Sequence, residues 1–472
     1  MKILNKIYIN GEFVTPHGTE TLDLFSPVSN EKVAEMTLAD EVDTQHAIAS
    51  AKEAFKTFSQ STKAERIAWL EKIHTVLKRR QQDLIDVMVD EYGGASAFVE
   101  MVIPASIDDF KEMAGVLKDF DFEPKASQSK VHLQGVGVVG VIIPWNMSNG
   151  FICTKVASAI AAGCTLVIKP SELSGQQTQI MMECLHEVGL PKGIVNFVNG
   201  IGAVVGAEMT RHPDLNKITF TGSTGVGKII AKGAADHMKR VTLELGGKSP
   251  NIILDDADFA DAIPKAIFAA YLNSGQACAA ATRLLVPVNH LAEVNAIAKA
   301  TIAQAIKVGD PKDSTVNIGP MVSKQQFERV EDYIRIGLEE GATLLTGGLG
   351  KPEGLDKGNF VKPTIFTDVD NSMRIAQEEI FGPVLSIIPY QDEADAIRIA
   401  NDTPFGLCSY ITSTDRARAL RVANQIDAGR VCINNVLHDP LAPFGGFKQS
   451  GIGREYGAFG LDAYLEPKAI IG

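Results

Sequence analysis

The chain has 472 residues, of which 45% are hydrophobic and 22% are charged. This length and balance predict a globular protein of two or three domains with a large buried core. The formal net charge of −12 disfavours nonspecific binding to nucleic acid. No stretch approaches the roughly 20 apolar residues of a membrane span, and the first residues lack the apolar core of a signal peptide. We therefore predict a cytoplasmic protein with neither a nucleic-acid nor a membrane partner.

The cysteine pattern argues against a disulfide framework and against a zinc site. Cysteines are few for this length, and no two have the C-x-x-C spacing. They are Cys153, Cys164, Cys184, Cys278, Cys408 and Cys432. A buried, unreactive thiol is the ordinary interpretation of any one of them. We predict no metal site.

The first 80 residues predict a hairpin and two helices. Two short apolar runs within Ile7–Val14 flank Asn10-Gly11, a pair that favours the tight turn of a hairpin, here at the edge of a domain. Two amphipathic helices follow, and Thr62 and Glu65 have the spacing of a capping box for the second. The apolar faces are Ile48, Ala51, Phe55 and Phe58 in the first helix and Ile67, Leu70, Ile73 and Leu77 in the second.

From about residue 135 short apolar runs alternate with helical stretches, in two series. The first series is Val136–Ile143, Thr165–Ile168, Ile194–Val198, Lys217–Thr221 and Val241–Leu243. The second is Asn251–Leu254, Leu284–Val288, Val384–Tyr390, Leu407–Thr412 and Val431–Asn434. This alternation predicts a parallel sheet followed by a second α/β domain. The boundary falls near residues 246–250, where glycines and a proline interrupt regular structure.

A glycine-rich turn follows the fourth strand of the first series. The segment Phe220–Lys228 predicts a strand, a turn and a helix, a geometry in which the backbone approaches a phosphate and the helix N-terminus favours its charge. Gly222, Ser223 and Gly227 are the candidate contacts. Ile229 stands where a P-loop has Ser or Thr, and the spacing differs from G-x-G-x-x-G. A plain tight turn is the alternative.

A second candidate binding segment is Lys169-Pro170-Ser171-Glu172, directly after the strand at Thr165–Ile168. Ligands meet the carboxyl ends of parallel strands, and Glu172 could accept both hydroxyls of an adenosine ribose. A carboxylate there repels a 2′-phosphate, so NAD is favoured and NADP stays open. The alternative is a solvated loop charge that contacts nothing.

Three residues could carry chemistry. Cys278 is flanked by small residues that leave its thiol unhindered, although reaction near neutral pH requires a pKa lowered from ~8.5 by a cation or backbone dipoles. Glu244 ends a strand, and a carboxylate in a low-dielectric cleft can act as a base. The amide of Asn146, also at a strand end, could donate to an oxyanion. The alternatives are a structural thiol, an ordinary strand-end carboxylate and a turn-forming Asn.

Taken in chain order, these motifs closely resemble the aldehyde dehydrogenase superfamily of the NAD(P)-dependent, non-acylating type. They are Pro144-Trp145-Asn146, Lys169-Pro170-Ser171-Glu172, Phe220-Thr221-Gly222-Ser223-Thr224, Glu244-Leu245-Gly246-Gly247-Lys248 and Gly275-Gln276-Ala277-Cys278. Further matches begin at Glu378, Asn401 and Pro443, so the resemblance spans nearly the whole chain.

The resemblance implies a Rossmann-like parallel-sheet cofactor domain, a second α/β domain that carries the thiol, and a small β arm that pairs subunits. The cofactor domain would comprise residues 1–115 and 135–245, and the catalytic domain residues 246–452. The arm would comprise residues 116–134 and 453–472. The implied assembly is a homodimer or a homotetramer.

The resemblance also implies that an aldehyde is oxidised to a carboxylic acid. Cys278 would attack the aldehyde, while the Asn146 amide and the Cys278 backbone N–H hold the oxyanion. Hydride would pass to nicotinamide, and Glu244 would activate the water that hydrolyses the thioester. Lys155 and Glu455 match positions proposed for proton handling. The implied cofactor contacts are Trp145, Lys169, Ser171, Glu172, Gly222, Ser223, Gly227, Glu379 and Phe381.

The sequence departs from many relatives near the substrate. Met147-Ser148 stands where they have Phe-Pro, and Thr154 replaces an aromatic residue before Lys155. Asn149, Thr154 and His438 then predict a more polar or roomier pocket and a small or polar aldehyde. A surface loop position is the alternative for His438.

Two other functions stay open. A CoA-acylating semialdehyde dehydrogenase would pass its thioester to a thiol, and Glu244, suited to activating water, argues against it. A catalytically silent NAD-binding protein would retain only the fold. The presence of Cys278, Glu244 and Asn146 together argues against that reading.

Overall fold

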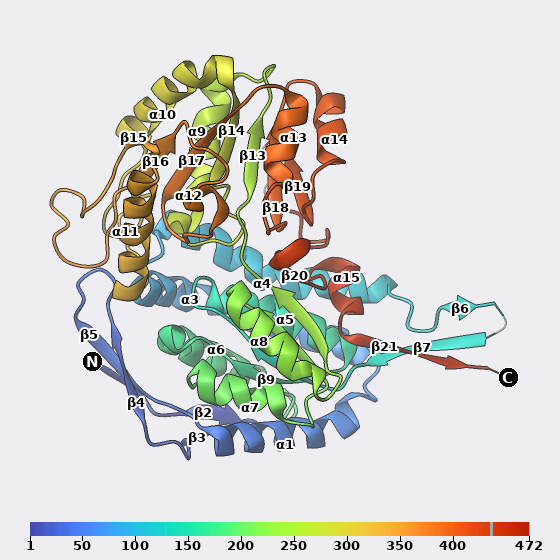
Figure 1. Cartoon of the computed structure of the whole chain (residues 1–472). Helices are drawn as coiled ribbons and strands as arrows, with labels where there is room; N and C mark the ends of the chain where they lie inside the picture. The colour runs from blue at the N-terminus through green and yellow to red at the C-terminus, as the bar shows by residue number, and fades with distance from the viewer. Residues whose placement is uncertain (128, 435–437, 472) are drawn as a thin grey trace.

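Two open sheets, one above the other in Figure 1, organise the molecule. The computed structural model describes residues 1–127, 129–434 and 438–471. The lower sheet has eight strands in the order β20-β12-β11-β8-β9-β10-β2-β3, of which the five from β12 to β10 are parallel. Their bounds are β2 Ile7–Ile9, β3 Glu12–Val14, β8 Val138–Ile142, β9 Thr165–Lys169, β10 Val195–Phe197, β11 Lys217–Thr221, β12 Arg240–Glu244 and β20 Gly451–Ile452.

The strand order of the lower sheet changes direction at β8. Strands β9 and β10 lie on one side of β8, whereas β11 and β12 lie on the other. At such a switch point the loops after neighbouring strands diverge and leave a crevice at the carboxyl ends of the strands. The loops after β8 and β11 carry Trp145-Asn146 and Gly222-Ser223. Both motifs therefore open onto this crevice.

Helices cover both faces of the lower sheet, with α2, α4, α5 and α6 in one apolar core and α1, α7 and α8 in the other. Helix α5 is buried along nearly its whole length, because nearly all its residues other than Asn149 and Lys155 are small or apolar. It begins beneath the crevice. The bounds are α1 Glu41–Phe58, α2 Lys63–Arg79, α3 Gln81–Val87, α4 Ser96–Asp119, α5 Ser148–Ala162, α6 Gly175–Val188, α7 Ala207–Arg211 and α8 Thr224–Ala235.

The upper sheet has seven strands in the order β15-β16-β17-β14-β13-β18-β19, all parallel except β15. Its bounds are β13 Pro250–Ile253, β14 Arg283–Pro287, β15 Thr343–Thr346, β16 Thr364–Thr367, β17 Val384–Tyr390, β18 Cys408–Thr412 and β19 Arg430–Ile433. The flanking helices are α9 Phe259–Ala270, α10 Leu291–Ala305, α11 Lys324–Glu339, α12 Arg374–Gln377, α13 Glu393–Asn401 and α14 Arg416–Ala423.

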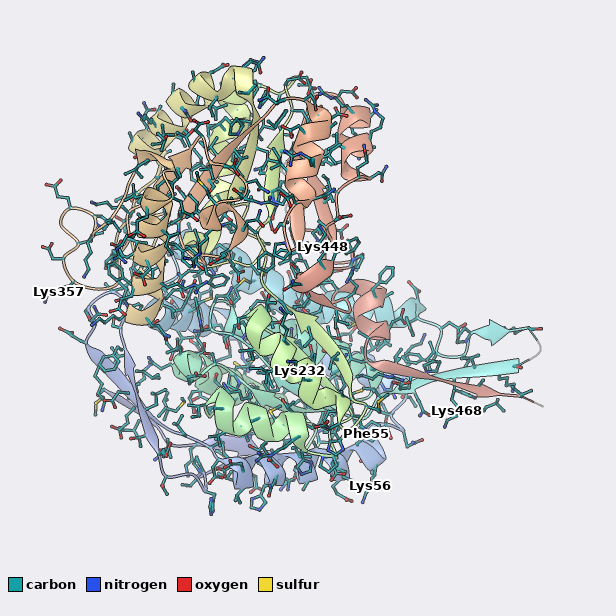
Figure 2. All side chains as sticks on the ribbon, in the orientation of Figure 1. Phe55, Lys56, Lys232, Lys357, Lys448 and Lys468 are labelled. Carbon is teal, nitrogen blue, oxygen red and sulfur yellow. The ribbon has the colours of Figure 1, made fainter. Side chains whose placement is uncertain are left out.

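The last part of the chain returns from the upper sheet to the lower one. Strand β20 pairs with β12, and α15 (Gly457–Asp462) then packs beside α4 and α5. Strand β21 (Leu465–Ile470) finally pairs with β7 (Ser129–Gly135), which also pairs with β6 (Lys125–Ala126). These three strands form an arm that projects from the body, with Lys468 on it (Figures 1 and 2).

The structure confirms every strand of the two predicted series, with ends shifted by no more than two residues. Both predicted helices and the Thr62–Glu65 capping box are present. Asn10 and Gly11 have φ values of 54° and 78°, as a hairpin turn requires. This hairpin is part of the lower sheet, because β2 pairs with β10 and extends it.

A three-stranded sheet near the N-terminus was not indicated by any sequence pattern. It has the order β1-β5-β4, with bounds β1 Lys2–Leu4, β4 Thr21–Phe25 and β5 Lys32–Thr37. Its strands are short, and β1 and β4 are largely exposed, with a single buried residue in each. Among the described residues, no helix combines the length and the apolarity needed to cross a membrane.

Candidate active site

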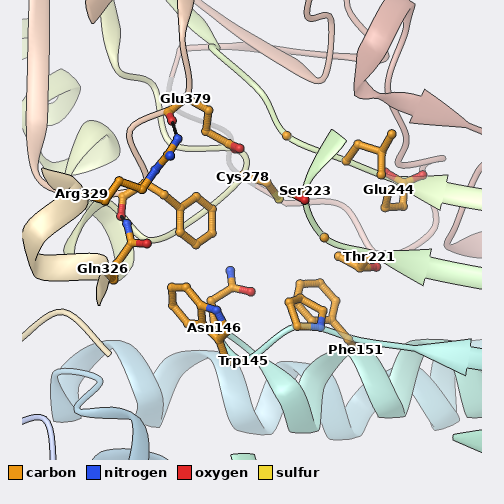
Figure 3. Close-up of a pocket in the computed structure, with 15 residues that line it drawn as sticks. Trp145, Asn146, Phe151, Thr221, Ser223, Glu244, Cys278, Gln326, Arg329 and Glu379 are labelled. Carbon is orange, nitrogen blue, oxygen red and sulfur yellow. Dashed lines mark hydrogen bonds between the residues drawn. The ribbon is translucent and has the colours of Figure 1, made fainter. Parts of the chain in front are cut away.

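A cleft of about 280 Å³ opens at the switch point of the lower sheet, and the upper half of the molecule completes its wall. Figure 3 shows Cys278 between Glu379 and Glu244, with Asn146 below it. The lining residues are Pro144, Trp145, Asn146, Phe151, Thr221, Gly222, Ser223, Glu244, Leu245, Gly246, Cys278, Gln326, Arg329, Glu379 and Phe381. The cleft therefore brings together the predicted nucleophile, base and amide donor with several predicted cofactor contacts.

The loop that carries Cys278 has an unusual backbone conformation. Asn273, Ser274 and Gly275 have φ values of 53°, 58° and 73°, a left-handed region that is costly for residues other than glycine. A Cβ atom at Gly275 would lie 2.3 Å from the carbonyl carbon of Gly382. Only glycine fits there, so this turn fixes where the thiol stands.

Gln276 anchors the same loop to two other segments. Its side-chain amide donates to the Tyr92 hydroxyl at 3.1 Å and to the Pro320 carbonyl oxygen at 3.3 Å. Its side-chain oxygen accepts from the Val322 N–H at 3.0 Å. Tyr92 precedes Gln276 by 184 positions, and no sequence pattern linked the two. Three hydrogen bonds of one side chain thus hold the loop that carries Cys278 against both segments.

The thiol of Cys278 is protonated near neutral pH. Its pKa is raised to about 12, first by burial and then by the carboxyl groups of Glu379 and Glu244. The backbone N–H groups of Ala279 and Cys278 lower the pKa by less. The backbone dipoles expected from the sequence are present, but burial outweighs them. To act as a nucleophile, the thiol would therefore have to lose its proton first.

The amide of Asn146 faces the nucleophile loop. Its Nδ2 donates to the Gln276 carbonyl oxygen at 2.9 Å, and its backbone oxygen accepts from the Asn273 amide at 3.1 Å. Asn146 is buried, so the orientation of its side chain is fixed. One N–H of the amide is engaged, and the second has no partner among the hydrogen bonds of the described residues, so it could donate to an oxyanion.

Glu244 ends β12 and is buried at the cleft. Neither of its carboxyl oxygens has a hydrogen-bond partner among the described residues. Burial, and then the charge of Glu455, raise the pKa of Glu244 well above its ordinary value, while Lys155 lowers it less. A carboxyl group in this state binds a proton tightly once it is ionised, which is the property of a general base.

Lys155 and Glu455 lie together behind Glu244. The Nζ atom of Lys155 lies 2.6 Å from Glu455 Oε1 and donates to the Thr221 hydroxyl at 2.8 Å. Both charged side chains are almost wholly buried. Thr221 lines the cleft, so the pair connects to it through one hydroxyl. The two residues lie 300 positions apart in the sequence and meet because β20 returns the chain to the lower sheet.

Part of the glycine-rich turn lines the cleft, and another part is buried beneath it. Gly222 and Ser223 line the cleft. The Gly222 N–H donates to the Glu244 carbonyl oxygen at 3.0 Å, and the Ser223 hydroxyl caps α8. Gly227 is buried instead, where a Cβ atom would lie 2.5 Å from a methyl group of Leu245. Gly227 thus lets α8 pack closely and does not line the cleft.

Lys169, Ser171 and Glu172 lie beyond the cleft lining, at the carboxyl end of β9. Lys169 Nζ is 3.0 Å from Glu172 Oε2 and also donates to the Pro170 carbonyl oxygen at 2.9 Å. The Ser171 hydroxyl accepts from the Leu173 N–H and so begins a short helical turn. Because β9 neighbours β8, these residues share the sheet edge that carries Trp145 and Asn146.

Glu379 and Phe381 enter the cleft from the upper half. The Glu379 carboxylate accepts from the Gly247 N–H at 3.1 Å, and burial raises its pKa to about 7. The Phe381 ring stands edge-on to the ring of Trp145, with centroids 5.4 Å apart. The approach of Glu379 requires glycine at position 246, where a Cβ atom would lie 2.4 Å from its Oε2.

Two residues of α11 hold this segment, and sequence reasoning missed both. Arg329 donates to the Glu379 carbonyl oxygen at 2.6 Å, and the Gln326 amide donates to that of Phe381 at 2.8 Å. Phe381 needs such support because its φ is +63°. Gln326 and Arg329 share one helix face, but only the fold shows which segment lies opposite.

Thr154 lies in polar surroundings with little free space. Thr154 donates to the buried carboxyl of Asp109 at 2.5 Å. Burial raises the pKa of Asp109 to about 7. The cavity that these two residues line with Tyr456 measures about 10 Å³, room for about one water molecule. Thr154 and Asp109 do not line the cleft that holds Cys278, so the more polar or roomier substrate pocket stays a prediction.

The other two predicted pocket residues differ in their surroundings. Asn149 is buried, and neither its amide nitrogen nor its oxygen has a hydrogen-bond partner among the described residues. His438 is exposed and stands edge-on to the ring of Tyr456, with centroids 5.4 Å apart. Neither residue lines the cleft that holds Cys278.

Comparison with known proteins decides the family. The sequence matches the model of the Aldehyde dehydrogenase family over residues 13–470. The chain belongs to the aldehyde dehydrogenase family. It is 42% identical to a 3-succinoylsemialdehyde-pyridine dehydrogenase of a Pseudomonas species, an alignment that covers 100% of this chain and 99% of that protein.

Two solved aldehyde dehydrogenases have the same fold. A mutant of aldehyde dehydrogenase C from Pseudomonas syringae, in complex with NAD+ and octanal, has a TM-score of 0.97 and 42% identity, covering 99% of this chain and 96% of that one. The Mycobacterium tuberculosis enzyme with NAD+ has a TM-score of 0.96 and 39% identity, covering 99% and 98%. The chain is thus an aldehyde-oxidising enzyme of this family.

Proposed function

We propose that this enzyme oxidises an aldehyde to a carboxylic acid with NAD+, through a thioester on Cys278 that is hydrolysed by water activated by Glu244. The observation that carries the proposal is the convergence of Cys278, Asn146 and Glu244 on one cleft at the switch point of the lower sheet. They come from three different segments, and the strained loop and the Gln276 hydrogen bonds hold the thiol in place.

In the first half of the reaction Cys278 and Asn146 act together to form the thioester. The thiol gives its proton to water in the open cleft, and the sulfur adds to the aldehyde carbon to give a thiohemiacetal. The free N–H of Asn146 and the backbone N–H of Cys278 stabilise the negative oxygen, because preorganised donors act strongly in a buried site. Departure of hydride from the same carbon leaves a thioester on Cys278.

The second half belongs to Glu244. As a carboxylate it removes a proton from water, and the resulting hydroxide adds to the thioester carbon. The C–S bond then breaks, the acid leaves, and the sulfur of Cys278 regains a proton. The unpartnered oxygens of Glu244 have no competing hydrogen bond among the described residues, which supports water rather than a thiol as the acceptor.

The crevice fits a dinucleotide, and bound NAD+ would supply one function, that of hydride acceptor. Free N–H groups at the start of α8 favour its pyrophosphate, and a Cβ atom at Gly225 would meet nothing within 4 Å. Val226 and Ile229 expose 44% and 67% of their surface, an apolar face suited to the adenine. Glu379 retains acceptor capacity for the nicotinamide ribose, beside the rings of Phe381 and Trp145.

NAD is favoured over NADP because Glu172 stands at the carboxyl end of β9. Its carboxylate would accept ribose hydroxyls and repel a 2′-phosphate. Lys169, at 3.0 Å, offsets part of that charge, so NADP stays a weaker second cofactor. Glu172→Gln should therefore raise kcat/KM with NADP relative to NAD, as NAD(P)H absorbance would show. An unchanged ratio would count against this role of Glu172.

A polar aldehyde is the substrate class that the Thr154 side favours. The buried pair of Asp109 and Thr154 stands where an aromatic wall would be apolar. We expect kcat/KM to be higher for a semialdehyde than for hexanal or benzaldehyde, and Thr154→Val to reduce that advantage. A strong preference for benzaldehyde would contradict the proposal.

The chemistry is tested with Cys278→Ala and Glu244→Gln. The first variant should show no NADH formation. The second should form about one NADH per subunit and then stop, because the thioester is no longer hydrolysed. Cys432→Ala, which changes a thiol outside the cleft lining, should keep wild-type turnover. Near-wild-type activity of Cys278→Ala would refute the proposal.

Adding CoA to the wild-type enzyme distinguishes hydrolysis of the thioester from its transfer to CoA. Under the proposal the rate and the carboxylic acid product are unchanged. Formation of an acyl-CoA would favour the acylating alternative. Binding of NAD+ without turnover of any aldehyde in the panel would favour a silent binding protein.

We also propose the division into a cofactor domain of residues 1–115 and 135–245, a catalytic domain of residues 246–452 and an arm of residues 116–134 and 453–472. Helix α4 runs to Asp119, so the first arm segment begins within that helix. Strand β21 leaves an open edge at the arm, where Ile470 is 48% exposed. Pairing of arms into a homodimer or homotetramer would cover it. Light scattering tests this, and a monomer mass would contradict it.

A further inference from the structure

A cavity of about 620 Å³ lies between the N-terminal sheet and the start of α11, at the left of Figure 1. Its volume is more than twice that of the cleft at Cys278 and falls within the range of small-molecule pockets, roughly 300–1,000 Å³. The lining residues are Asp23, Leu24, Phe25, Asn30, Glu91, Leu173, Val322, Ser323, Lys324, Gln325 and Asn359. None of them lines the cleft, so the two spaces are separate.

One part of this cavity is apolar. It is lined by Leu24 of β4 and by Leu173, and a Cβ atom at Gly175, where α6 begins, would lie 3.0 Å from a methyl group of Leu24. Phe25 also lines the cavity and exposes 55% of its surface, so part of the apolar lining meets solvent. An alkyl chain bound here would remove that surface from water.

Asn359 contributes a buried amide to the lining. The residue is only 3% exposed, and its side chain has no hydrogen-bond partner within the part of the chain that the structure describes. Its backbone is fixed, because its N–H donates to the Pro27 carbonyl oxygen and its carbonyl oxygen accepts from the Met321 N–H, both at 2.9 Å. A buried amide without a partner destabilises a fold, so its place at the wall of a cavity points to a bound group.

The start of α11 adds further donors and a positive charge. Ser323 caps this helix by accepting from the Gln326 N–H at 3.2 Å. The N–H groups of Lys324 and Gln325 lie in the first turn, where they have no partner within the helix. The Lys324 side chain is 81% exposed, and its ion pair with Glu328 is long, at 3.7 Å. Its charge and the helix dipole therefore both attract an anion to this part of the cavity.

The two carboxyl groups of the lining are already balanced. Asp23 pairs with Lys32 at 2.7 Å. Glu91 accepts from the N–H groups of Gln176 and Gln177 at 2.6 and 2.9 Å, at the start of α6. Burial raises the pKa of Glu91 to about 7, while these hydrogen bonds lower it less, so part of this group is uncharged at neutral pH. The donors and the lysine of α11 thus decide the charge of a ligand.

We propose that this cavity is a second binding site, which takes a carboxylic acid with an alkyl chain. The carboxylate lies at the start of α11 beside the Asn359 amide, and the chain lies on the apolar residues around Phe25. Binding needs no chemistry at Cys278, so the site does not depend on the proposed function. Only one link rests on that function, namely that oxidation of an alkyl aldehyde in the cleft would yield an acid of this class.

The cavity shares two wall segments with the anchor of the loop that carries Cys278. Val322 lines the cavity, and its N–H donates to the Gln276 side-chain oxygen at 3.0 Å. Glu91 lines it too, and the next residue, Tyr92, accepts from the Gln276 amide at 3.1 Å. A bound acid would hold both segments and so reduce the local opening of these hydrogen bonds.

Octanoate is the probe for this site, and octylamine is the counter-probe of opposite charge. Calorimetry measures the affinity of both, and a photoreactive diazirine analogue of octanoate, followed by peptide mapping, locates the bound chain. Lys324→Glu reverses an exposed charge, and Asn359→Leu removes an amide that has no partner. Lys299→Glu, which changes an exposed lysine of α10 outside the cavity lining, is the matched control.

The label should appear in peptides that contain Phe25 or Leu173, and affinity should rise roughly fourfold for each methylene from hexanoate to octanoate. Both cavity variants should weaken octanoate binding at least tenfold, whereas Lys299→Glu should not. Octanoate should also slow hydrogen exchange at the Val322 N–H.

Three results would overturn the site. They are tighter binding of octylamine than of octanoate, labelling confined to peptides of the cleft, and wild-type affinity in either cavity variant that folds. The exposed position of Lys324 keeps the test available if Asn359→Leu does not fold. Failure of the proposed function is distinct, because it appears as turnover in Cys278→Ala, a variant that should still bind octanoate in this cavity.

Discussion

Raising the pH around the cofactor-free enzyme in the presence of iodoacetamide tests the state of Cys278 directly. Alkylation requires the thiolate. The pKa of this thiol is raised from near 9 to about 12, chiefly by burial. The alkylation rate at Cys278 should therefore rise about tenfold for each pH unit between 7 and 10, with no plateau.

The size of the effect follows from two opposing factors. At pH 7.5 a pKa of about 12 leaves roughly 3 thiols in 100,000 ionised, against roughly 3 in 100 for a pKa of 9, a deficit of about 1,000-fold. A more basic thiolate is also more nucleophilic, by roughly 20-fold over this range. The net rate at pH 7.5 should then be about 50-fold below that of a cysteine in an unfolded peptide.

Peptide mapping by mass spectrometry gives the rate for Cys278 separately from the other thiols. Cys278→Ser is the control for the assignment of the labelled peptide. A rate at pH 7.5 close to that of the peptide, or a plateau with a midpoint below pH 9, would refute the reasoning. It would mean that the backbone N–H groups of Cys278 and Ala279 outweigh burial.

Three further variants test other parts of the structure. Asn146→Ala should lower kcat roughly 100- to 1,000-fold, as loss of one oxyanion donor does, and a loss below tenfold in an aldehyde assay would speak against that role. Gly275→Ala should lower the melting temperature, because its Cβ atom would lie 2.3 Å from the Gly382 carbonyl carbon, whereas Gly225→Ala, with nothing within 4 Å, should not. Burial raises the pKa of Asp109 in the folded protein to about 7, above its value in the unfolded chain. The neutral carboxyl therefore contributes fully to the stability of the fold below about pH 4, and this contribution is lost as the pH rises to 7. The melting temperature of Asp109→Asn minus that of the wild type should therefore increase from pH 4 to 7 and level off above pH 7. A difference that is the same at every pH would contradict this.

The sheets could be predicted because their strands are buried on both faces. Val384–Tyr390 and Lys217–Thr221 stand out as short runs bounded by turns or helices, and the structure places strands there. The N-terminal sheet lacks such an apolar run, since three of the five residues of its strand Thr21–Phe25 are exposed and only one is buried. Periodicity reports burial, so strands near the surface escape it.

The site was predictable in its members but not in its electrostatics. Strand ends predicted the positions of Asn146 and Glu244, and the family resemblance added Cys278, which lies in the second series of strands. The cleft contains all three. The direction of the Cys278 pKa shift depends on burial by distant segments, which no local pattern reports. The space beside Thr154 likewise depends on Asp109, 45 positions away.

The return of the chain through β20 has a consequence for how the protein is made. The lower sheet receives its last strand at residues 451–452, and Glu455 reaches Lys155 only after that pairing. During synthesis, more than 200 residues must leave the ribosome after β12 before this edge of the sheet is covered. The lower half thus cannot finish folding ahead of the upper half, in contrast to chains whose domains fold one after another. Termination before β20 would leave an open edge beside β12 and an unpaired Lys155, so an early stop should give an aggregating product and not a smaller enzyme.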